Sequence, residues 1–490
     1  MSSPQLRRRL TSADASFLYS EKPSAALHIG STSLLDGTIS RDELIEHMRT
    51  RIHLVPRYRE IAVFDQFNVA HPAWEPDPNF DIDRHVVEVR LPDGATEADL
   101  LQHIANMSAP MLPRDRPLWK MVLTQNLPGS GNSAVTSLVH HCMVDGVSGV
   151  ELLQAITDLE RDAAPLDVRP FERPDPADPM ERSRAAMAEA FDQSLAQASE
   201  NFKRWLNPQR QMDEFQTISK ALASAAPVMT TAAPSTPWNQ PVGPKRSHAV
   251  VATQMSDFRG IRSMLGGTLN DVVLTTLAGG LGRYLRAHGR DTSGVELRAM
   301  VPVNVRGSSD QTALGNQVSM YLAPLPVGIV DSRERHKLVT ARMNGLKEAG
   351  QASGFAMLTR LSESVPAGLQ AFAGLMAPSV QPLFNIVCTN VPGPQVPLYL
   401  AGRRFETLWP LVPLSMGLGM GCALTSYNGT LFWGLQADPA LVPDIDLVAQ
   451  SIQAAFDDIK QEALVAAAES QPPPPPAASA HLQREPVAAR

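Results

Sequence analysis

Two stretches of alternating strand and helix patterns, separated by a proline-rich interval, set the main limit on how this chain folds. The first spans residues 10–160 and includes the β-branched, apolar segment 133–141, which predicts a buried strand. The second begins near residue 247, after the proline-rich and charged residues 163–179 and an amphipathic helix pattern ending at Leu206. A chain of 490 residues is long enough for two domains. We therefore expect two mixed α/β domains.

Changes in composition predict where these domains begin and end. We expect an N-terminal domain over residues 1–165, a linker with amphipathic helices over 166–247, and a C-terminal domain over 248–465. Residues 466–490 are rich in proline and alanine, and this composition predicts a disordered tail. Two local signals are specific: Ser40 with Glu43 predicts a capped helix start, and Asn428-Gly429 predicts a hairpin turn.

The composition excludes several classes of protein. A net charge of -7 argues against a nucleic-acid partner. The 3 cysteines are widely spaced, which argues against a disulfide framework and a thiolate zinc site. The chain has no run of about 18 apolar residues and no signal-peptide pattern. We expect a cytoplasmic protein, with peripheral contact to the inner membrane face or to lipid droplets left open.

The segment His140–Gly146, with the sequence HHCMVDG, carries the clearest chemical signal. A neutral imidazole accepts a proton from a hydroxyl group near neutral pH, because its usual pKa is about 6.5. Neighbouring strand residues point to opposite faces, so one histidine would act as a base while the other packs or orients it. The same geometry disfavours a metal site. Asp145 would orient the histidine or pair with an arginine, for which we nominate Arg306, and Gly146 would allow close approach of a substrate.

A packing role for the two histidines remains open at this point. A serine hydrolase is disfavoured, because the chain contains no GxSxG segment.

The HHCMVDG segment resembles the HHxxxDG motif of CoA-dependent acyltransferases related to chloramphenicol acetyltransferase, carnitine acyltransferases and peptide-synthetase condensation domains. Further segments are similar to those of the bacterial bifunctional wax ester synthase/diacylglycerol acyltransferase family. The resemblance covers residues 8–460, and the segments that carry it are LTSADASFLYSE, PRYR at 56–59, RPLW at 116–119, LGGTLNDVVL at 265–274, VPVNVR, GNQVSMYLAPLP and TNVPGP at 389–394.

This resemblance implies a fold and a reaction. The fold would be two chloramphenicol-acetyltransferase-like domains, each a mixed sheet flanked by helices, with the active-site channel between them. His141 would be the general base that deprotonates a diacylglycerol or a long-chain alcohol, and the alkoxide would attack acyl-CoA directly. Acyl-CoA is then a substrate, and we expect neither a cofactor nor a metal ion.

The resemblance also nominates further site residues. Asn270 matches the family's ND motif and would either stabilise the oxyanion or cap a helix. Asp271 and Arg306 would support the structure, and Cys142 would pack beside the base. Two sets would line the channel or serve only packing and turns: Pro117, Leu118 and Trp119, and Thr389, Asn390 and Gly393.

Three functions remain open. The chain would make triacylglycerol or wax esters, use the same chemistry on another alcohol acceptor, or bind lipids without catalysis. Poorly soluble substrates would also bring it to a membrane or lipid-droplet surface, through Arg7–Arg9 or through the helix with Phe191, Phe202 and Trp205. The alternative for that helix is packing between the domains.

Overall fold

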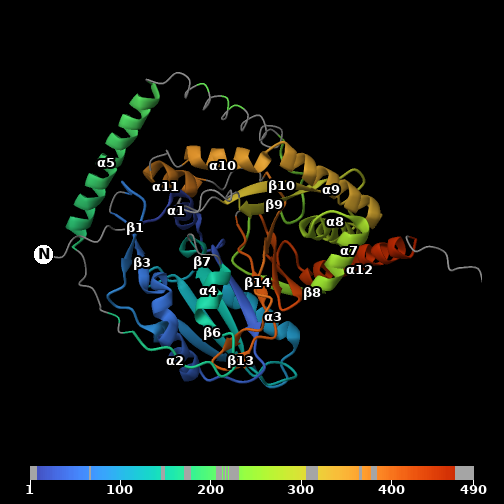
Figure 1. The fold of residues 1–490 in the computed structure, drawn as a ribbon, viewed down its shortest axis with the longest axis horizontal. Coiled ribbons are helices and arrows are strands. Elements are labelled where there is room, and N and C mark those ends of the chain that lie inside the picture. The colour runs from blue at the N-terminus through green and yellow to red at the C-terminus, as the bar shows by residue number, and fades with distance from the viewer. Residues whose placement is uncertain are drawn as a thin grey trace, which may run out of the picture.

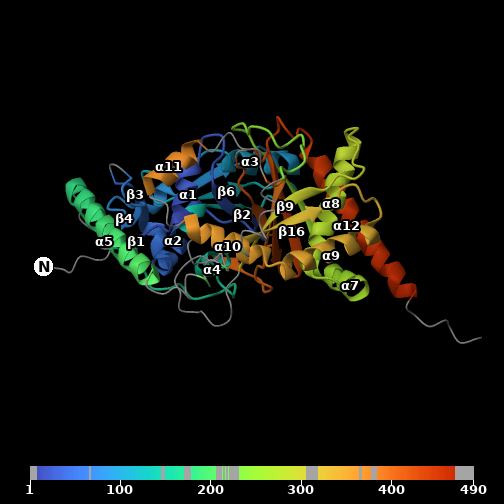
Figure 2. The ribbon, with the colours of Figure 1, turned by 90° about the horizontal axis from the view of Figure 1, so that it is seen from above.

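The computed structural model describes most of the chain. The described residues are 8–65, 68–144, 149–169, 171, 178–205, 212, 216, 219, 231–304, 318–362, 367–376, 383–415 and 417–469. They form two mixed β-sheets with helices packed on them, side by side in one elongated molecule (Figures 1 and 2). Two mixed α/β units were expected, and the fold class is confirmed.

The first sheet has five strands in the order β14-β2-β7-β6-β5, and only the β5–β6 pair is parallel. Helices α2, α3 and α4 flank it. Helix α2 begins with the predicted capping box of Ser40 and Glu43. The bounds are β2 (His28–Leu34), β5 (Val86–Arg90), β6 (Trp119–Gln125), β7 (Ala134–His140), β14 (Trp409–Leu411), α2 (Arg41–Arg51), α3 (Glu97–Ser108) and α4 (Gly149–Ile156).

The second sheet has six strands in the order β10-β9-β11-β15-β16-β8, with β11 parallel to both of its neighbours. The hairpin between β15 and β16 turns at Asn428 and Gly429, both at positive φ, as predicted. The bounds are β8 (Ser247–Gln254), β9 (Leu297–Asn304), β10 (Val318–Leu325), β11 (Ile386–Val391), β15 (Met420–Tyr427), β16 (Thr430–Ala437), α7 (Met255–Leu265), α8 (Leu269–Ala287), α9 (Ser332–Glu348), α10 (Gln351–Ser362), α11 (Ala367–Met376) and α12 (Ile445–Glu469).

A small third sheet, β1-β4-β3, lies at the end of the molecule near α5 (Figure 1). Helix α5 is held to it by two ion pairs, Arg9–Glu189 at 2.5 Å and Arg182–Glu75 at 3.1 Å. The remaining bounds are β1 (Arg8–Arg9), β3 (Glu60–Val63), β4 (Ala73–Pro76), β12 (Tyr399–Leu400), β13 (Arg403–Arg404), α1 (Ser12–Ser20) and α5 (Pro179–Trp205), with short 3-10 helices at Ile52–Leu54, Pro56–Arg59, Ile82–Arg84 and His141–Met143.

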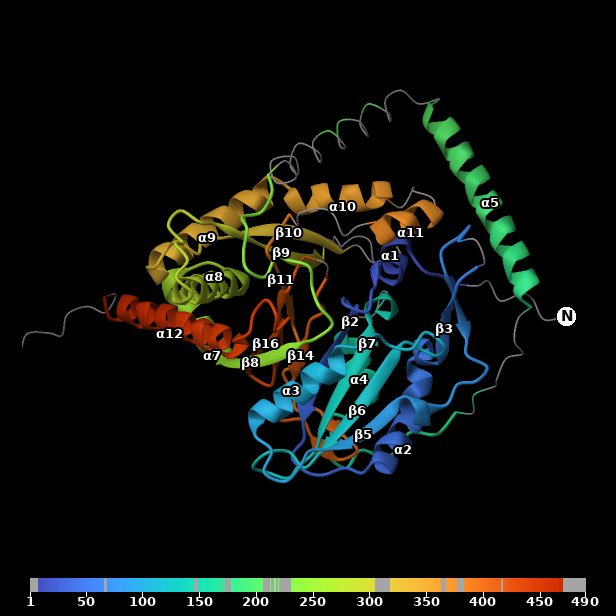
Figure 3. The ribbon, with the colours of Figure 1, turned by 180° about the vertical axis from the view of Figure 1, so that it is seen from behind.

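The two halves are joined by exchanged elements. Strand β14 comes from the second half of the chain, yet it pairs with β2 in the first sheet. Tyr427, at the end of β15, packs in the core of the first half. Helix α11 reaches across from the second half and lies on α1, while α10 packs on β10 and α9 of its own half (Figure 3). The expected C-terminal domain over 248–465 therefore contains elements, such as β14, that pack in the first half of the molecule.

Two further features concern the helices. Helix α12 continues to Glu469, so the expected disordered tail is helical over its first four residues, 466–469; residues 470–490 lie outside the described part. Among the described helices, none is both long enough and apolar enough to cross a bilayer.

Candidate active site

The histidine pair stands where strand β7 ends. His140 is the last strand residue, and His141 begins a single 3-10 turn. The Cys142 N–H donates to Nδ1 of His140 at 3.2 Å, so a neutral His140 carries its proton on Nε2. The two rings have different partners, as expected, but the reason is the end of the strand rather than alternation along it.

Glu21 is a buried carboxylate beside this turn that the sequence analysis did not single out. Its Oε1 lies 3.4 Å from Nε2 of His140, and Oε2 accepts from Arg114 at 3.0 Å. Burial by itself would raise the pKa of Glu21, but His140, the Leu27 N–H and Arg114 lower it to about 2. Glu21 is therefore an anion that faces Nε2 of His140 in the buried site. It is the last residue of LTSADASFLYSE, one of the segments that carried the resemblance.

His141 is enclosed by helix α1 and only partly exposed. Its ring stacks on Phe17 of that helix, with 4.0 Å between ring centroids, and its backbone N–H donates to the Leu27 carbonyl at 2.9 Å. Burial lowers the pKa of His141 to about 4. The imidazole is therefore neutral at pH 7, the form that accepts a proton.

Cys142 is buried, and burial raises the pKa of its thiol well above the usual value. A protonated, enclosed thiol is a poor nucleophile, in agreement with the expected packing role. Asp145 and Gly146 of the motif, and the nominated partner Arg306, lie outside the described residues.

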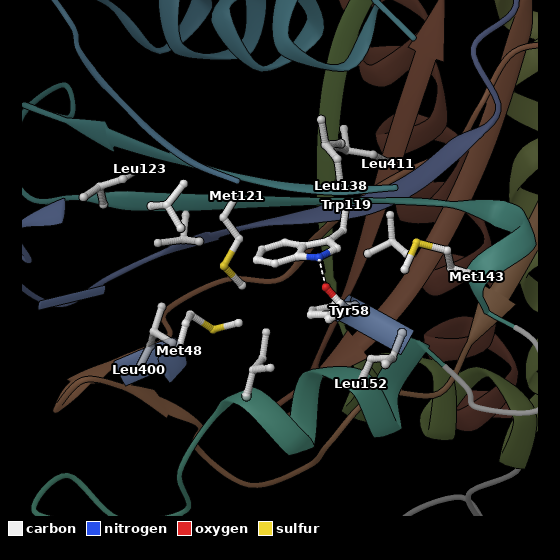
Figure 4. Packing of buried hydrophobic residues seen from close by; sticks show 14 of the residues in the cluster. Met48, Tyr58, Trp119, Met121, Leu123, Leu138, Met143, Leu152, Leu400 and Leu411 are labelled. Carbon is white, nitrogen blue, oxygen red and sulfur yellow. Dashed lines mark hydrogen bonds between the residues drawn. The ribbon is translucent and has the colours of Figure 1, made fainter. Parts of the chain in front are cut away.

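Trp119 begins β6, the strand next to β7, and Pro117 and Leu118 directly precede it; all three are buried. Trp119 stacks on Tyr58 and donates from Nε1 to the Tyr58 carbonyl at 2.8 Å, in the core shown in Figure 4. The Leu118 carbonyl accepts from the His140 N–H at 2.9 Å. The burial of these three residues favours packing over lining a channel. The hydrogen bond between Leu118 and His140 joins their segment to the histidine turn through the backbone.

The start of α8 shows which of two roles, helix capping or oxyanion stabilisation, is open to Asn270. Thr268 is the N-cap, and it forms a capping box with Asp271. The capping alternative for Asn270 is therefore wrong, while Asp271 has the structural position expected of it. Asn270 is exposed, and its Oδ1 accepts from Nδ2 of Asn390 at 2.7 Å. The pair leaves Asn270 with its own amide N–H group as a donor.

Thr389, Asn390 and Gly393 lie at the carboxyl end of β11. Thr389 and Asn390 are partly exposed there. A Cβ added to Gly393 would lie 2.1 Å from the carbonyl oxygen of Ser426 on β15, so only glycine fits this close approach. Gly393 is thus explained by packing.

The carboxyl end of β11 faces the first half of the molecule. Strand β11 runs parallel to β15, and Tyr427 at the end of β15 packs into the first core. The Asn270–Asn390 pair therefore lies on the side of the second sheet that faces the half carrying His141. His141 itself lies under α1, which is covered by α11 from the second half. His141 therefore comes from the first half and the Asn270–Asn390 pair from the second, on the sides of the two halves that face each other.

Comparison with protein families identifies both halves of the chain. Residues 10–273 match the wax ester synthase/diacylglycerol acyltransferase catalytic domain, and residues 314–460 match the C-terminal domain of the same family. A putative diacylglycerol O-acyltransferase of Mycobacterium tuberculosis H37Rv is 30% identical over 461 residues, covering 92% of this chain and 90% of the relative. A probable diacylglycerol O-acyltransferase of the same strain is 28% identical over 458 residues, covering 91% and 94%.

Solved structures share the fold. The wax ester synthase/diacylglycerol acyltransferase of Marinobacter aquaeolei VT8 superposes with a TM-score of 0.66 at 21% identity, covering 93% of this chain and 99% of that one. The first condensation domain of the calcium-dependent antibiotic synthetase gives 0.57 at 16% identity, covering 94% and 97%. These superpositions show the shared fold. The two family matches extend over more than half of the sequence, and with the curated relatives they show that the chain belongs to the wax ester synthase/diacylglycerol acyltransferase family and is an acyltransferase.

Proposed function

We propose that this acyltransferase transfers a long-chain acyl group from acyl-CoA to the hydroxyl of a diacylglycerol or of a long-chain alcohol, with His141 as the general base. The observation that carries the proposal is the neutral imidazole of His141, enclosed under α1 at the junction between the halves. The names of the two mycobacterial relatives support diacylglycerol as the acceptor.

The reaction needs one proton carrier. The imidazole of His141 takes the acceptor's hydroxyl proton as the oxygen attacks the thioester carbonyl. The carbon–sulfur bond then breaks, the ester is released, and the imidazolium returns the proton to the CoA thiolate. We assign Asn270 the donor that stabilises the oxyanion, because Asn390 holds its amide with the N–H group left to donate. The reaction written this way requires no cofactor and no metal ion.

Release of the CoA thiol from palmitoyl-CoA tests the function directly. We expect release with dioleoylglycerol or hexadecanol, and a roughly 10²–10⁴-fold lower rate for His141→Ala. His103→Ala, on α3 of the same half, is the matched control and should keep the wild-type rate. Release without any alcohol would indicate a thioesterase. No release with either alcohol would favour another acceptor or a lipid-binding homologue.

We also propose that the enzyme works in peripheral contact with a lipid surface. Several large apolar side chains of α5 are more than half exposed, which contradicts the alternative that this helix packs between the domains; they are Met180, Met187, Phe191, Leu195 and Phe202. The side chain of Trp205 lies outside the described part, as does Arg7. Vesicle flotation of a variant lacking the first nine residues tests the arginines, and unchanged binding would exclude them.

A further inference from the structure

Four large apolar side chains are exposed close to α1, and we refer to them as the α11 face. They are Leu369 and Phe372 on α11, which are 57% and 59% exposed, and Phe64 and Val69 after β3, which are 36% and 41% exposed. The catalytic step proposed above does not use them. Exposed apolar groups gathered in one place mark a contact surface more often than isolated ones do.

Helix α11 has an inner side and an outer side. Ala367 is buried, and Gln370 and Ala371 follow it at the three- and four-residue spacing of one helix face. Gln370 accepts a hydrogen bond from Oγ of Ser12 on α1 at 2.9 Å, and Ala371 packs against the first core. Leu369 and Phe372, three residues apart, therefore point away from α1.

The loop after β3 adjoins the same helix. A Cβ added to Gly368 would lie 3.6 Å from the carbonyl oxygen of Asn68, which places the start of α11 next to Val69. The ring centroids of Phe64 and of Tyr19 on α1 are 6.3 Å apart. The four side chains thus form one surface around the exposed side of the α1–α11 pair.

This surface is one helix away from the candidate base. Phe17 of α1 stacks on His141, and α11 covers α1. A lipid that entered beside α1 would bring its hydroxyl toward His141 without crossing the body of either domain.

Charge beside the α11 face favours a lipid surface as its partner. Arg8 of β1 is exposed and is paired in register with Trp74 of β4. Trp74 is in turn paired with Ala62 of β3, the strand that leads into Phe64, so Arg8 lies two strands away from β3 in the same small sheet. An apolar surface with an arginine on the adjoining small sheet matches the apolar and anionic layers of a bilayer or droplet interface.

We propose that the α11 face rests on the lipid surface that holds the acceptor, and that the acceptor enters the enzyme beside α1. This inference depends on the proposed lipid acceptor. It differs from contact through α5, because it places the lipid next to the base rather than on the helix that projects from the small sheet (Figure 1).

The test uses the full-length enzyme and vesicles of phosphatidylcholine and phosphatidylglycerol that contain dioleoylglycerol. The double variant Leu369→Ser/Phe372→Ser should float with vesicles at least tenfold less than wild type. The KM for vesicle-borne dioleoylglycerol should rise by a similar factor, with little change in kcat. The matched control is Leu464→Ser/Val465→Ser on α12, where two exposed apolar residues lie at the other end of the molecule, and it should behave as wild type.

Three results would overturn the proposal. The first is unchanged flotation of the α11 variant with an unchanged KM. The second is loss of flotation and a raised KM only in Phe191→Ser/Phe202→Ser, which would assign the contact to α5. The third is a change of the α11 variant from dimer to monomer in size-exclusion chromatography, which would identify a protein interface. Turnover of wild type with 1-hexanol and no vesicles reports acyl transfer separately, so failure of the proposed function is distinguishable from failure of the α11 face.

Discussion

The imidazole ring of His141 lies nearly parallel to the phenyl ring of Phe17, with 17° between the ring planes. The two residues are far apart in sequence, and α1 brings them together over the turn that follows β7. The contact shields the imidazole from water, and this desolvation disfavours its charged form. The helix that covers the candidate base also keeps it in the form that accepts a proton.

The pH dependence of the rate follows from this burial. The pKa of His141 is lowered to about 4, so the neutral base persists as the pH falls through the usual histidine range near 6.5. We expect kcat/KM to stay level between pH 7 and pH 5 and to fall near pH 4. A profile measured with palmitoyl-CoA and a fixed acceptor checks this, and a decline centred near pH 6.5 would contradict it.

Substitution of Phe17 should act on the base without removing it. Phe17→Ala rehydrates the imidazole, so the pKa of His141 should move back toward its usual value and the acid limb toward neutral pH. Loss of an aromatic stack worth about 0.5–1.5 kcal/mol predicts a rate at pH 7 that is roughly 2–13-fold lower. Phe80→Ala removes a looser stack on His85, with 5.6 Å between ring centroids, and is the control, with no expected shift in the rate profile. If the acid limb of the pH–rate profile of Phe17→Ala stayed at the wild-type pH, desolvation by α1 would not be the cause of the lowered pKa of His141.

Glu21 should contribute to stability in a defined pH window. Its folded-state pKa of about 2 lies below the ordinary value of 4.5, so its stabilisation is present above pH 4.5 and is lost as the pH falls toward 2. The difference corresponds to roughly 3 kcal/mol at pH 7. Glu21→Gln should lower the free energy of unfolding by about that amount and flatten its decline at acid pH.

Urea unfolding at several pH values measures this effect. Glu46→Gln is the control, because Glu46 is an exposed carboxylate on α2 that pairs only with Arg49 among the ion pairs of the described residues. If Glu21→Gln and Glu46→Gln had equal free energies of unfolding at pH 7, the proposed stabilisation by Glu21 would be wrong.

The hydrogen bond between Asn390 and Asn270 predicts coupled effects on the rate. Asn270→Ala should reduce kcat by about 10²–10³-fold if its amide stabilises the oxyanion. Asn390→Ala should reduce kcat less, and the double variant should be no slower than Asn270→Ala, because Asn390 acts through Asn270. Thr268→Ala removes the helix cap and should cost about 1 kcal/mol of stability with little change in kcat. Multiplicative losses in the double variant would show that the two amides act independently.

The close approach at Gly393 predicts a loss of stability. In Gly393→Ala the added methyl would lie 2.1 Å from the Ser426 carbonyl oxygen, so the segment that follows β11 must move away from β15, at an expected cost above about 2 kcal/mol. Gly345→Ala in α9 meets nothing within 4 Å and should stabilise by about 0.5–1 kcal/mol. Thermal unfolding compares the two, and similar melting temperatures would refute the packing explanation.

Local features of this fold were predictable because the interactions that decide them lie within a few residues. The capping box of Ser40 and Glu43 and the hairpin at Asn428-Gly429 are formed by hydrogen bonds and backbone angles of neighbouring residues. The position of the histidine pair at a strand end follows from the apolar, β-branched run before it. The same reasoning left Asn270 with two roles, and only the observed Thr268–Asp271 box decided between them.

The sequence by itself determined the mixed α/β class, the local turns and caps, and the motif that nominated His141, because each depends on residue order and short-range periodicity. The tertiary structure alone decided which distant groups meet. It placed Glu21 beside His140, Phe17 on His141, Asn390 against Asn270, and β14 in the sheet of the other half. Such contacts join residues up to several hundred positions apart, and they form only when burial of the two apolar cores brings their elements together. No periodicity in the chain records them.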